Sequence, residues 1–228
     1  QCRSESAVDW DLMGHALGRL LTDGNARPVL TGNFYRPDVN KLKKFFSSLA
    51  TTSGCEICHI AGCTAEAPTL EAALMNHQPA ARITLTQQDC DRSLAEVCDK
   101  GSADVQLVTL GCPHYTLEEI RDAAMLLRGR KVAGGVRLQI WTDMTMQHLA
   151  EVNGYAQIIR DAGAYLLNSS CPMVAARTAY DIVTTGFAAD GAKQSHYVHS
   201  DLNGRNCKVF YGGMAQCIEA AISGRWEA

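Results

Sequence analysis

Hydrophobic and polar positions along the 228-residue chain follow two alternating periods. Segments with apolar residues three and four positions apart, typical of helices, alternate with short apolar segments rich in β-branched residues, typical of buried strands. Strands that are separated by helices of about a dozen residues form largely parallel sheets through right-handed crossovers. The pattern therefore predicts an α/β fold of layered domains, with largely parallel sheets flanked by helices.

Local signals place the ends of these elements. Thr116 and Glu119 have the spacing of a capping box, and Asn153-Gly154 is a weak point in an otherwise long helix. The only candidate domain junction, near residues 131–135, would divide the chain into 1–130 and 131–228. We expect helices at 8–22, 39–50, 70–74, 88–101, 117–129, 143–162 and 214–222, and strands at 26–32, 56–62, 81–86, 104–111, 136–141, 164–168, 181–185 and 208–212.

Composition narrows the class of protein. With 46% hydrophobic and 20% charged residues, the chain can bury a substantial core. Its net charge of -3 and pI near 6.2 provide no basic stripe, so nucleic acid is not an expected partner. No apolar run approaches the roughly 20 residues that span a bilayer, and the first residues do not form a signal peptide. We therefore expect a cytoplasmic protein without a membrane partner.

Three loops at predicted strand ends carry thiol or polar groups: AGCTAEAPT, LGCPHYT and NSSCPM. Parallel sheets present such loops to ligands. Cys112 and Cys171 are each followed by proline, which restricts the turn and can hold a thiolate toward a metal cluster. Either cysteine alone is more typical of a buried structural residue, but the repeated arrangement makes the two interpretations about equal.

Other titratable residues in these loops have both functional and structural interpretations. His114 lies just before a helix, where it could bind substrate or move a proton. Alternatively, its imidazole could have only a structural role, with its hydrogen bonds made within the turn. Glu66, beside Thr64, could orient or titrate a substrate group, although a solvated loop carboxylate is the more common case. Lys193 and His196, in a predicted polar loop with Tyr197, suit an anionic substrate but are also ordinary on a surface.

A different kind of metal site is also open. The chain has ten cysteines at irregular spacings, most of which we expect to be small buried residues. Cys55, Cys58 and Cys63 have spacings found in zinc and iron-sulfur sites. Cys55 and Cys58 fall in a predicted strand, where positions three apart point to opposite faces. A zinc site therefore requires this segment to form a knuckle and not a strand.

Taken together, these segments resemble the large subunit of the aconitase X family. HIAGCTAEAPT is similar to the family's H-x-x-G-x-T-P-E-A-P-T loop, and GCPHYTLEEI resembles its G-C-P-H-x-[ST]-x-E-E-[IL] segment closely. SSCPM takes the place of the family's D-T-C strand end. GAKQSHY and CKVFYGGMAQCIEAAISG are similar to its N-S-x-K-x-x-H-Y loop and its closing run. Gly191 stands where the family usually has serine, and the resemblance extends over nearly the whole chain.

The resemblance implies an iron-sulfur hydro-lyase, most readily a dehydratase of cis-3-hydroxy-L-proline, with phosphomevalonate as the alternative substrate. It implies that Cys112 and Cys171 ligate the cluster, whose type (2Fe-2S, 3Fe-4S or 4Fe-4S) stays open. The residues it places at the substrate are His114, Glu66 and Lys193 as catalytic candidates and Thr64, Ser170 and His196 as binding candidates.

The resemblance also implies partners. The family's large subunit has an N-terminal region with a further cluster cysteine, and a small swivel-domain subunit is expected to bring a catalytic serine. Neither is recognisable in this sequence, so other polypeptide parts would complete the site. A noncatalytic subunit that keeps the fold for assembly or binding is the rival hypothesis.

Overall fold

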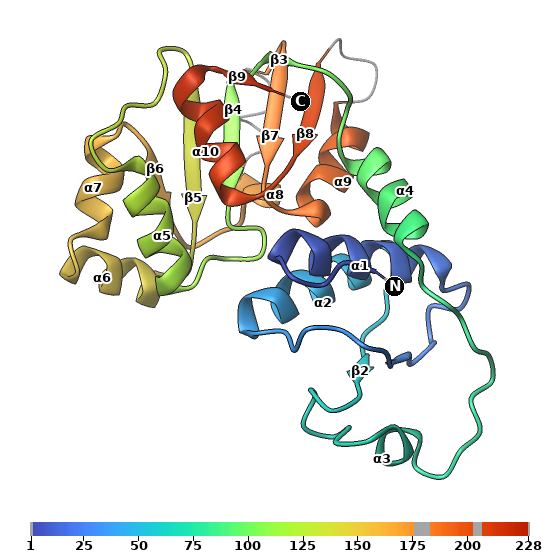
Figure 1. Ribbon diagram of the computed structural model, residues 1–228. Coiled ribbons are helices and arrows are strands. Elements are labelled where there is room, and N and C mark those ends of the chain that lie inside the picture. The colour runs from blue at the N-terminus through green and yellow to red at the C-terminus, as the bar shows by residue number, and fades with distance from the viewer. Residues whose placement is uncertain (1, 176–182, 203–206, 228) are drawn as a thin grey trace. The chain divides into compact units, whose positions relative to one another are not determined.

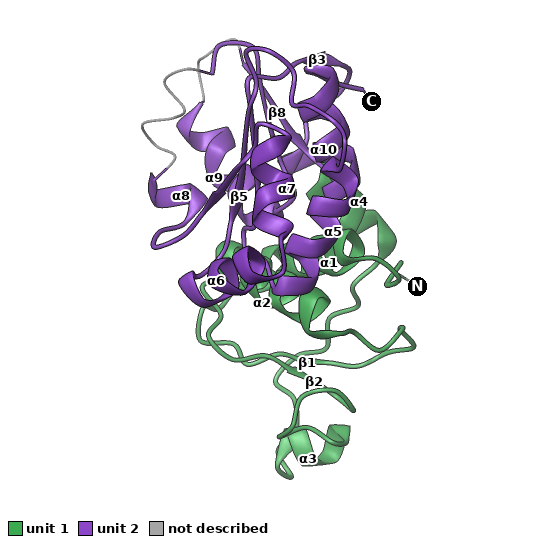
Figure 2. Cartoon of the chain, turned by 90° about the vertical axis from the view of Figure 1, so that its left-hand side faces the viewer, with its two compact units in different colours: residues 1–94 green, residues 95–228 purple. Residues whose placement is uncertain are grey.

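The computed structural model describes residues 2–175, 183–202 and 207–227. The chain divides into two compact units, residues 1–94 and residues 95–228 (Figure 2).

Unit 1 is built on two helices, α1 (Ala7–Leu20) and α2 (Val39–Ser53), that pack closely. A Cβ atom at Gly14 would lie 2.1 Å from the Phe45 carbonyl oxygen, so only glycine permits this approach. Trp10 is fully buried and meets the Phe45 ring edge to face. The smaller elements are β1 (Val29–Leu30), which pairs in parallel with β2 (His59–Ile60), α3 (Leu70–Leu74) and α4 (Gln87–Val97), which crosses the division (Figure 1).

Unit 2 contains a five-stranded parallel sheet in the order β6-β5-β4-β7-β8 (Figure 1). Its first strand along the chain therefore lies at its centre. A separate pair of antiparallel strands carries Trp226, whose ring stacks on that of Phe210 with 5.2 Å between the ring centroids. The strands are β4 (Leu107–Leu110), β5 (Arg137–Trp141), β6 (Tyr165–Leu167), β7 (Gly186–Ala189) and β8 (Lys208–Tyr211), with β3 (Ala103–Asp104) and β9 (Arg225–Trp226) forming the pair.

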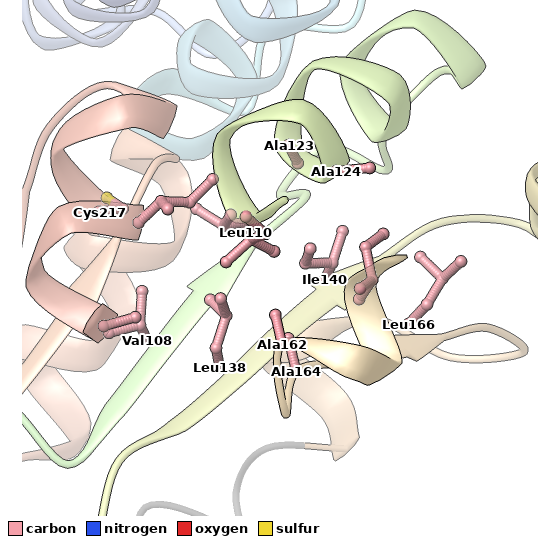
Figure 3. Close-up of a cluster of buried hydrophobic side chains, with 14 of the residues drawn as sticks. Val108, Leu110, Ala123, Ala124, Leu138, Ile140, Ala162, Ala164, Leu166 and Cys217 are labelled. Carbon is pink, nitrogen blue, oxygen red and sulfur yellow. The ribbon is translucent and has the colours of Figure 1, made fainter. Parts of the chain in front are cut away.

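Helices cover both faces of this sheet, as alternation along each strand requires. Val108, Leu110 and Ile140 face one side, where they pack against α5, α6, α7 and α10 (Figure 3). Leu107 and Phe187 face the other side, toward α9. Figure 2 shows the sheet between α8 and α9 on one side and α5, α7 and α10 on the other. The helices are α5 (Leu117–Leu127), α6 (Met144–Val152), α7 (Tyr155–Asp161), α8 (Pro172–Ala175), α9 (Ala192–Asp201) and α10 (Met214–Ser223).

The predicted α/β class is confirmed, and so are two local features. Thr116 and Glu119 form the expected capping box at the start of α5. The expected long helix after residue 143 is divided into α6 and α7 at Gly154, whose φ of 78° is left-handed.

Several expected elements differ. Residues 81–86 form no strand and are mostly exposed, because they have no partner strand in the described chain. The strand expected at 56–62 is limited to β2, and residues 55–58 lie outside it. The strand expected at 181–185 begins outside the described residues, whereas β7 starts at Gly186. The expected loop around Lys193 is the helix α9.

The division between the units also lies elsewhere than the junction expected near residue 131. Residues 131–135 belong to the crossover from α5 to β5. Because β4 and β5 pair along their whole common length, the chain on both sides of this crossover shares one core. The compact units separate instead between residues 94 and 95.

Candidate active site

The candidate site lies at the carboxyl edge of the unit 2 sheet. Strands β4, β5 and β6 extend the sheet in one direction, whereas β7 joins β4 on its other side. The strand order thus reverses between β4 and β7, and ligands of open parallel sheets bind beyond the carboxyl ends at such a point. The loops after these two strands begin at Gly111 and Asp190.

The loop after β4 carries Cys112 and His114. Cys112 is 6% exposed, and it is joined to Pro113 by a cis peptide bond. Behind this loop, the Tyr115 amide donates to the Trp141 carbonyl oxygen at 3.0 Å, and the Thr142 hydroxyl donates to the Tyr115 carbonyl oxygen at 2.7 Å. The end of β5 therefore anchors the backbone at the far end of the Cys112 loop.

Asp190, directly after β7, is a site residue that the sequence did not reveal. Its carboxylate is 3% exposed and accepts from the Gly111 amide at 3.0 Å and from the Tyr115 hydroxyl at 2.7 Å. Burial of Tyr115, together with the negative charge of Asp190, holds the pKa of this phenol well above its usual value of 10.0. The only signal in the sequence is a carboxylate that follows an apolar run.

The loop after β6 carries Ser170 and Cys171. The Ser170 carbonyl oxygen lies 2.8 Å from His114 Nε2, which joins this loop to the loop after β4. Because a carbonyl oxygen can only accept, Nε2 donates in this contact, and in the neutral imidazole Nδ1 is then the nitrogen that can accept a proton. Cys171 is half-buried, and its carbonyl oxygen accepts from the amides of Val174 and Ala175, the last two residues of α8.

The helix α9 begins at the same edge of the sheet, directly after β7. Its N-cap, Gly191, provides no side-chain hydrogen bond to the first turn. Lys193 lies in that turn and His196 one turn further, and both side chains are half-buried. The expected polar residues therefore project from a helix whose amino end, like a cation, favours an anionic ligand.

Thr64 and Glu66 belong to unit 1, in the loop after β2. The Thr64 hydroxyl accepts from the Ile60 amide at 3.1 Å and is half-buried, whereas Glu66 is exposed. Because the two units are not placed relative to one another, the roles of Thr64 and Glu66 at the substrate stay predictions.

The ten cysteines, all among the described residues, form no disulfide bond. Burial raises the pKa of the Cys58 thiol to about 12, which opposes the thiolate form that metals bind. Among the residues that the structure describes, no group of three or more His, Cys, Asp or Glu side chains has the arrangement of a metal site. This absence includes Cys55, Cys58 and Cys63, so the zinc hypothesis receives no support from the described residues.

Cys112 and Cys171 can supply two thiol ligands from this chain. They follow β4 and β6, which flank β5, so the axes of their strands lie about 10 Å apart. Two thiols are a partial donor set for an iron-sulfur cluster, since such clusters are generally held by more than two protein ligands. A cluster at this edge would need further ligands beyond the two thiols that the described residues bring here.

A parallel α/β unit with thiols, an imidazole and a lysine at its carboxyl edge has the layout of an enzyme. The family models specify it further. The model described as "Aconitase X third domain" matches residues 105–223, and "Aconitase X second domain" matches residues 1–95, in agreement with the two compact units. The chain belongs to the aconitase X family.

Relatives of known name agree with this assignment. The cis-3-hydroxy-L-proline dehydratase of Pseudomonas aeruginosa is 30% identical over 93% of this chain and 36% of its own length. The phosphomevalonate dehydratase large subunit of Methanosarcina mazei is 26% identical over 95% of this chain and 49% of its own length. The chain thus spans between about a third and a half of these relatives.

A solved structure has the same fold. The crystal structure of Thermococcus kodakaraensis aconitase X in its holo-form superposes with a TM-score of 0.78 at 22% identity. The match covers 97% of this chain and 53% of that structure. Among the described residues, no helix has the length and apolar character needed to cross a membrane.

Proposed function

We propose that this chain forms part of the active site of a hydro-lyase that dehydrates a small hydroxy acid. The observation that carries the proposal is the gathering of Cys112, His114, Cys171 and Lys193 on loops and a helix at one edge of the sheet. Membership in the aconitase X family supports it, as do relatives named dehydratases. We favour cis-3-hydroxy-L-proline as substrate because the 30% identical relative bears that name.

In this proposal, Cys112 and Cys171 are thiolate ligands of an iron-sulfur cluster. When bound, such a cluster supplies a Lewis acid for the substrate hydroxyl. Lys193, with the first turn of α9, binds the substrate carboxylate by charge and amide dipoles. His114, held by the Ser170 carbonyl oxygen, presents Nδ1 as the base that removes a proton from the carbon beside the hydroxyl-bearing carbon.

Other polypeptide parts would complete this site. The relatives that are named large subunits support a small-subunit partner, and the described residues bring no third cluster ligand together with the two thiols. Within the proposal, Thr64, Glu66, Ser170 and His196 contact substrate, and the cytoplasm is the expected compartment.

The test is the iron and sulfide content per chain, measured after anaerobic purification together with any copurifying chains. We expect Cys112→Ser and Cys171→Ser each to lose iron and dehydratase activity. The matched control is Cys207→Ser, a half-buried cysteine just before β8, at the opposite edge of the sheet. Wild-type protein without iron, or iron that survives both changes, would contradict the proposal and favour a noncatalytic assembly subunit.

A further inference from the structure

One buried carboxylate holds both ends of the segment that carries Cys112 and His114. Asp190 Oδ1 accepts from the Gly111 amide at 3.0 Å, and Asp190 Oδ2 accepts from the Tyr115 hydroxyl at 2.7 Å. These two donors lie immediately before and immediately after the three residues Cys112, Pro113 and His114. The segment is therefore closed at both ends by contacts with the neighbouring strand's loop.

The residue after Asp190 adds a steric constraint on the same segment. A Cβ atom at Gly191 would lie 2.1 Å from the Cys112 carbonyl oxygen. The backbone of the β7 loop is thus in direct contact with the backbone of Cys112. Movement of Cys112 toward β7 is blocked, while the carboxylate of Asp190 prevents movement away.

The burial of these groups makes the arrangement specific. Asp190 and Tyr115 are 3% and 1% exposed, so little water is available to replace either hydrogen bond. Hydrogen bonds to a carboxylate are also stronger than those between neutral groups. The ring of Tyr115 packs in the main core of unit 2, which fixes its hydroxyl in turn.

We propose that Asp190 is a positioning residue that sets the directions of the Cys112 thiol and the His114 imidazole. The inference rests on the proposed function, because it assigns Asp190 a role through a cluster ligand and a base. Asp190 acts through hydrogen bonds to Gly111 and Tyr115 and takes no part in the reaction itself. Outer partners of this kind orient the groups that hold a metal.

The test compares two substitutions. Asp190→Ala removes both acceptors, and we expect the affinity for iron during cluster reconstitution to fall by about 10-fold to 100-fold, as when other outer partners of metal ligands are removed. Asp190→Asn keeps the shape, with Oδ1 accepting from Gly111 and Nδ2 donating to the Tyr115 oxygen, so it should retain most of the wild-type affinity and visible spectrum. A purely charge-based role would not be rescued by asparagine.

Hydrogen exchange provides a readout that does not depend on iron. In Asp190→Ala, the Gly111 amide should exchange at least about tenfold faster than in wild type, because it loses a buried acceptor. The amides of β5 serve as the internal control, and their unchanged exchange shows that the unit remains folded. In Asp190→Asn, Gly111 should stay protected.

These readouts separate the two proposals. Wild-type protein without iron would overturn the proposed function. Fast exchange at Gly111 in Asp190→Ala would still show that Asp190 fixes the segment that carries Cys112 and His114. Unchanged exchange at Gly111 in Asp190→Ala would overturn the role of Asp190 whatever the iron content. Equal loss of iron in Asp190→Ala and Asp190→Asn would also overturn positioning by these two hydrogen bonds.

Discussion

The two Cys-Pro segments of unit 2 have the same dipeptide and each follows a parallel strand, but they are held very differently. Cys112 follows β4, the central strand, and is enclosed by contacts from the ends of both β5 and β7. Cys171 follows β6, an edge strand, and is half-buried. The place of the strand in the sheet, and not the dipeptide, therefore decides how firmly the thiol is fixed.

Residues of β6 and of the loop after it also differ from those around Cys112. Tyr165 of β6 is 53% exposed, whereas Tyr115 beside Cys112 is 1% exposed. Ser169, just before Ser170, has a φ of 63°, in the left-handed region that disfavours residues with a Cβ atom. The β6 segment thus combines fewer neighbours with a strained residue, and it should be the more adaptable of the two segments.

The largest effect should come from adding a side chain at the contact between the end of β5 and the Cys112 segment. Gly111→Ser introduces a Cβ atom 2.2 Å from the Trp141 carbonyl oxygen at a left-handed φ of 94°, and we expect a loss of about 3 kcal/mol in the free energy of unfolding. Gly135→Ser is the matched control, since its φ of 86° is also left-handed and no atom lies within 4 Å of its Cβ position. Native-state hydrogen exchange of the β4 amides measures both, and equal values would contradict the close contact.

Removal of one hydroxyl should have the next largest effect. Tyr115→Phe deletes the 2.7 Å hydrogen bond to Asp190 and leaves a buried carboxylate with one partner fewer, at a cost of about 2 kcal/mol. Tyr165→Phe, on the exposed edge strand, should change stability by less than about 0.5 kcal/mol. The same exchange measurement applies, and a similar cost for both tyrosines would remove the distinction between the two segments.

Alkaline pH should weaken unit 2 through the same tyrosine. The folded-state pKa of Tyr115 is raised, so its contribution is fully present below pH 10, where the phenol is protonated in both states. Above that pH the unfolded chain loses the proton first, and stability falls by about 1.4 kcal/mol per pH unit until the folded-state pKa is reached. Urea unfolding between pH 9 and pH 11 should show this slope in wild type, and an undiminished slope in Tyr115→Phe would assign it to other groups.

The smallest effect is expected at the edge segment. Ser169→Gly relieves the left-handed strain but adds freedom to the unfolded chain, so we expect a net gain of no more than about 0.5 kcal/mol. Thermal unfolding followed by circular dichroism is the measurement. A loss of more than about 1 kcal/mol would mean that the contacts of the Ser169 side chain outweigh its backbone strain.

The sequence predicts the part of the fold that has strong local signals. The strand, loop and helix from β4 to α5 are expected from an apolar run, a glycine and the capping box of Thr116 and Glu119. The strand β7 is not expected, because three of its four residues, one glycine and two alanines, have weak strand preference. It is held by pairing with β4 and β8. A Cβ atom at Gly186 would lie 2.4 Å from the Asp104 carbonyl oxygen, a requirement that no local pattern reveals.

The candidate site shows the same limit. Cys112, His114 and Lys193 are candidates from the sequence alone, because each residue type has its own chemistry and lies in a predicted loop. Asp190 is not found, because its role depends on β7 lying beside β4, and this neighbour relation is set by tertiary packing. The helix α9 is not predicted either, since its N-cap is a glycine without a capping side chain.

The central position of β4 also has a consequence for how the chain is made. Gly111 and Asp190 are 79 positions apart, so the Cys112 segment leaves the ribosome long before its anchor exists. At about 5 to 20 residues per second, this interval lasts roughly 4 to 16 seconds, during which the thiol is open to oxidation and to any metal ion nearby. Under the proposed function, the site can be loaded with iron in its final arrangement only after β7 has been synthesised. The anchor at Asp190 protects the Cys112 segment only from that point onward.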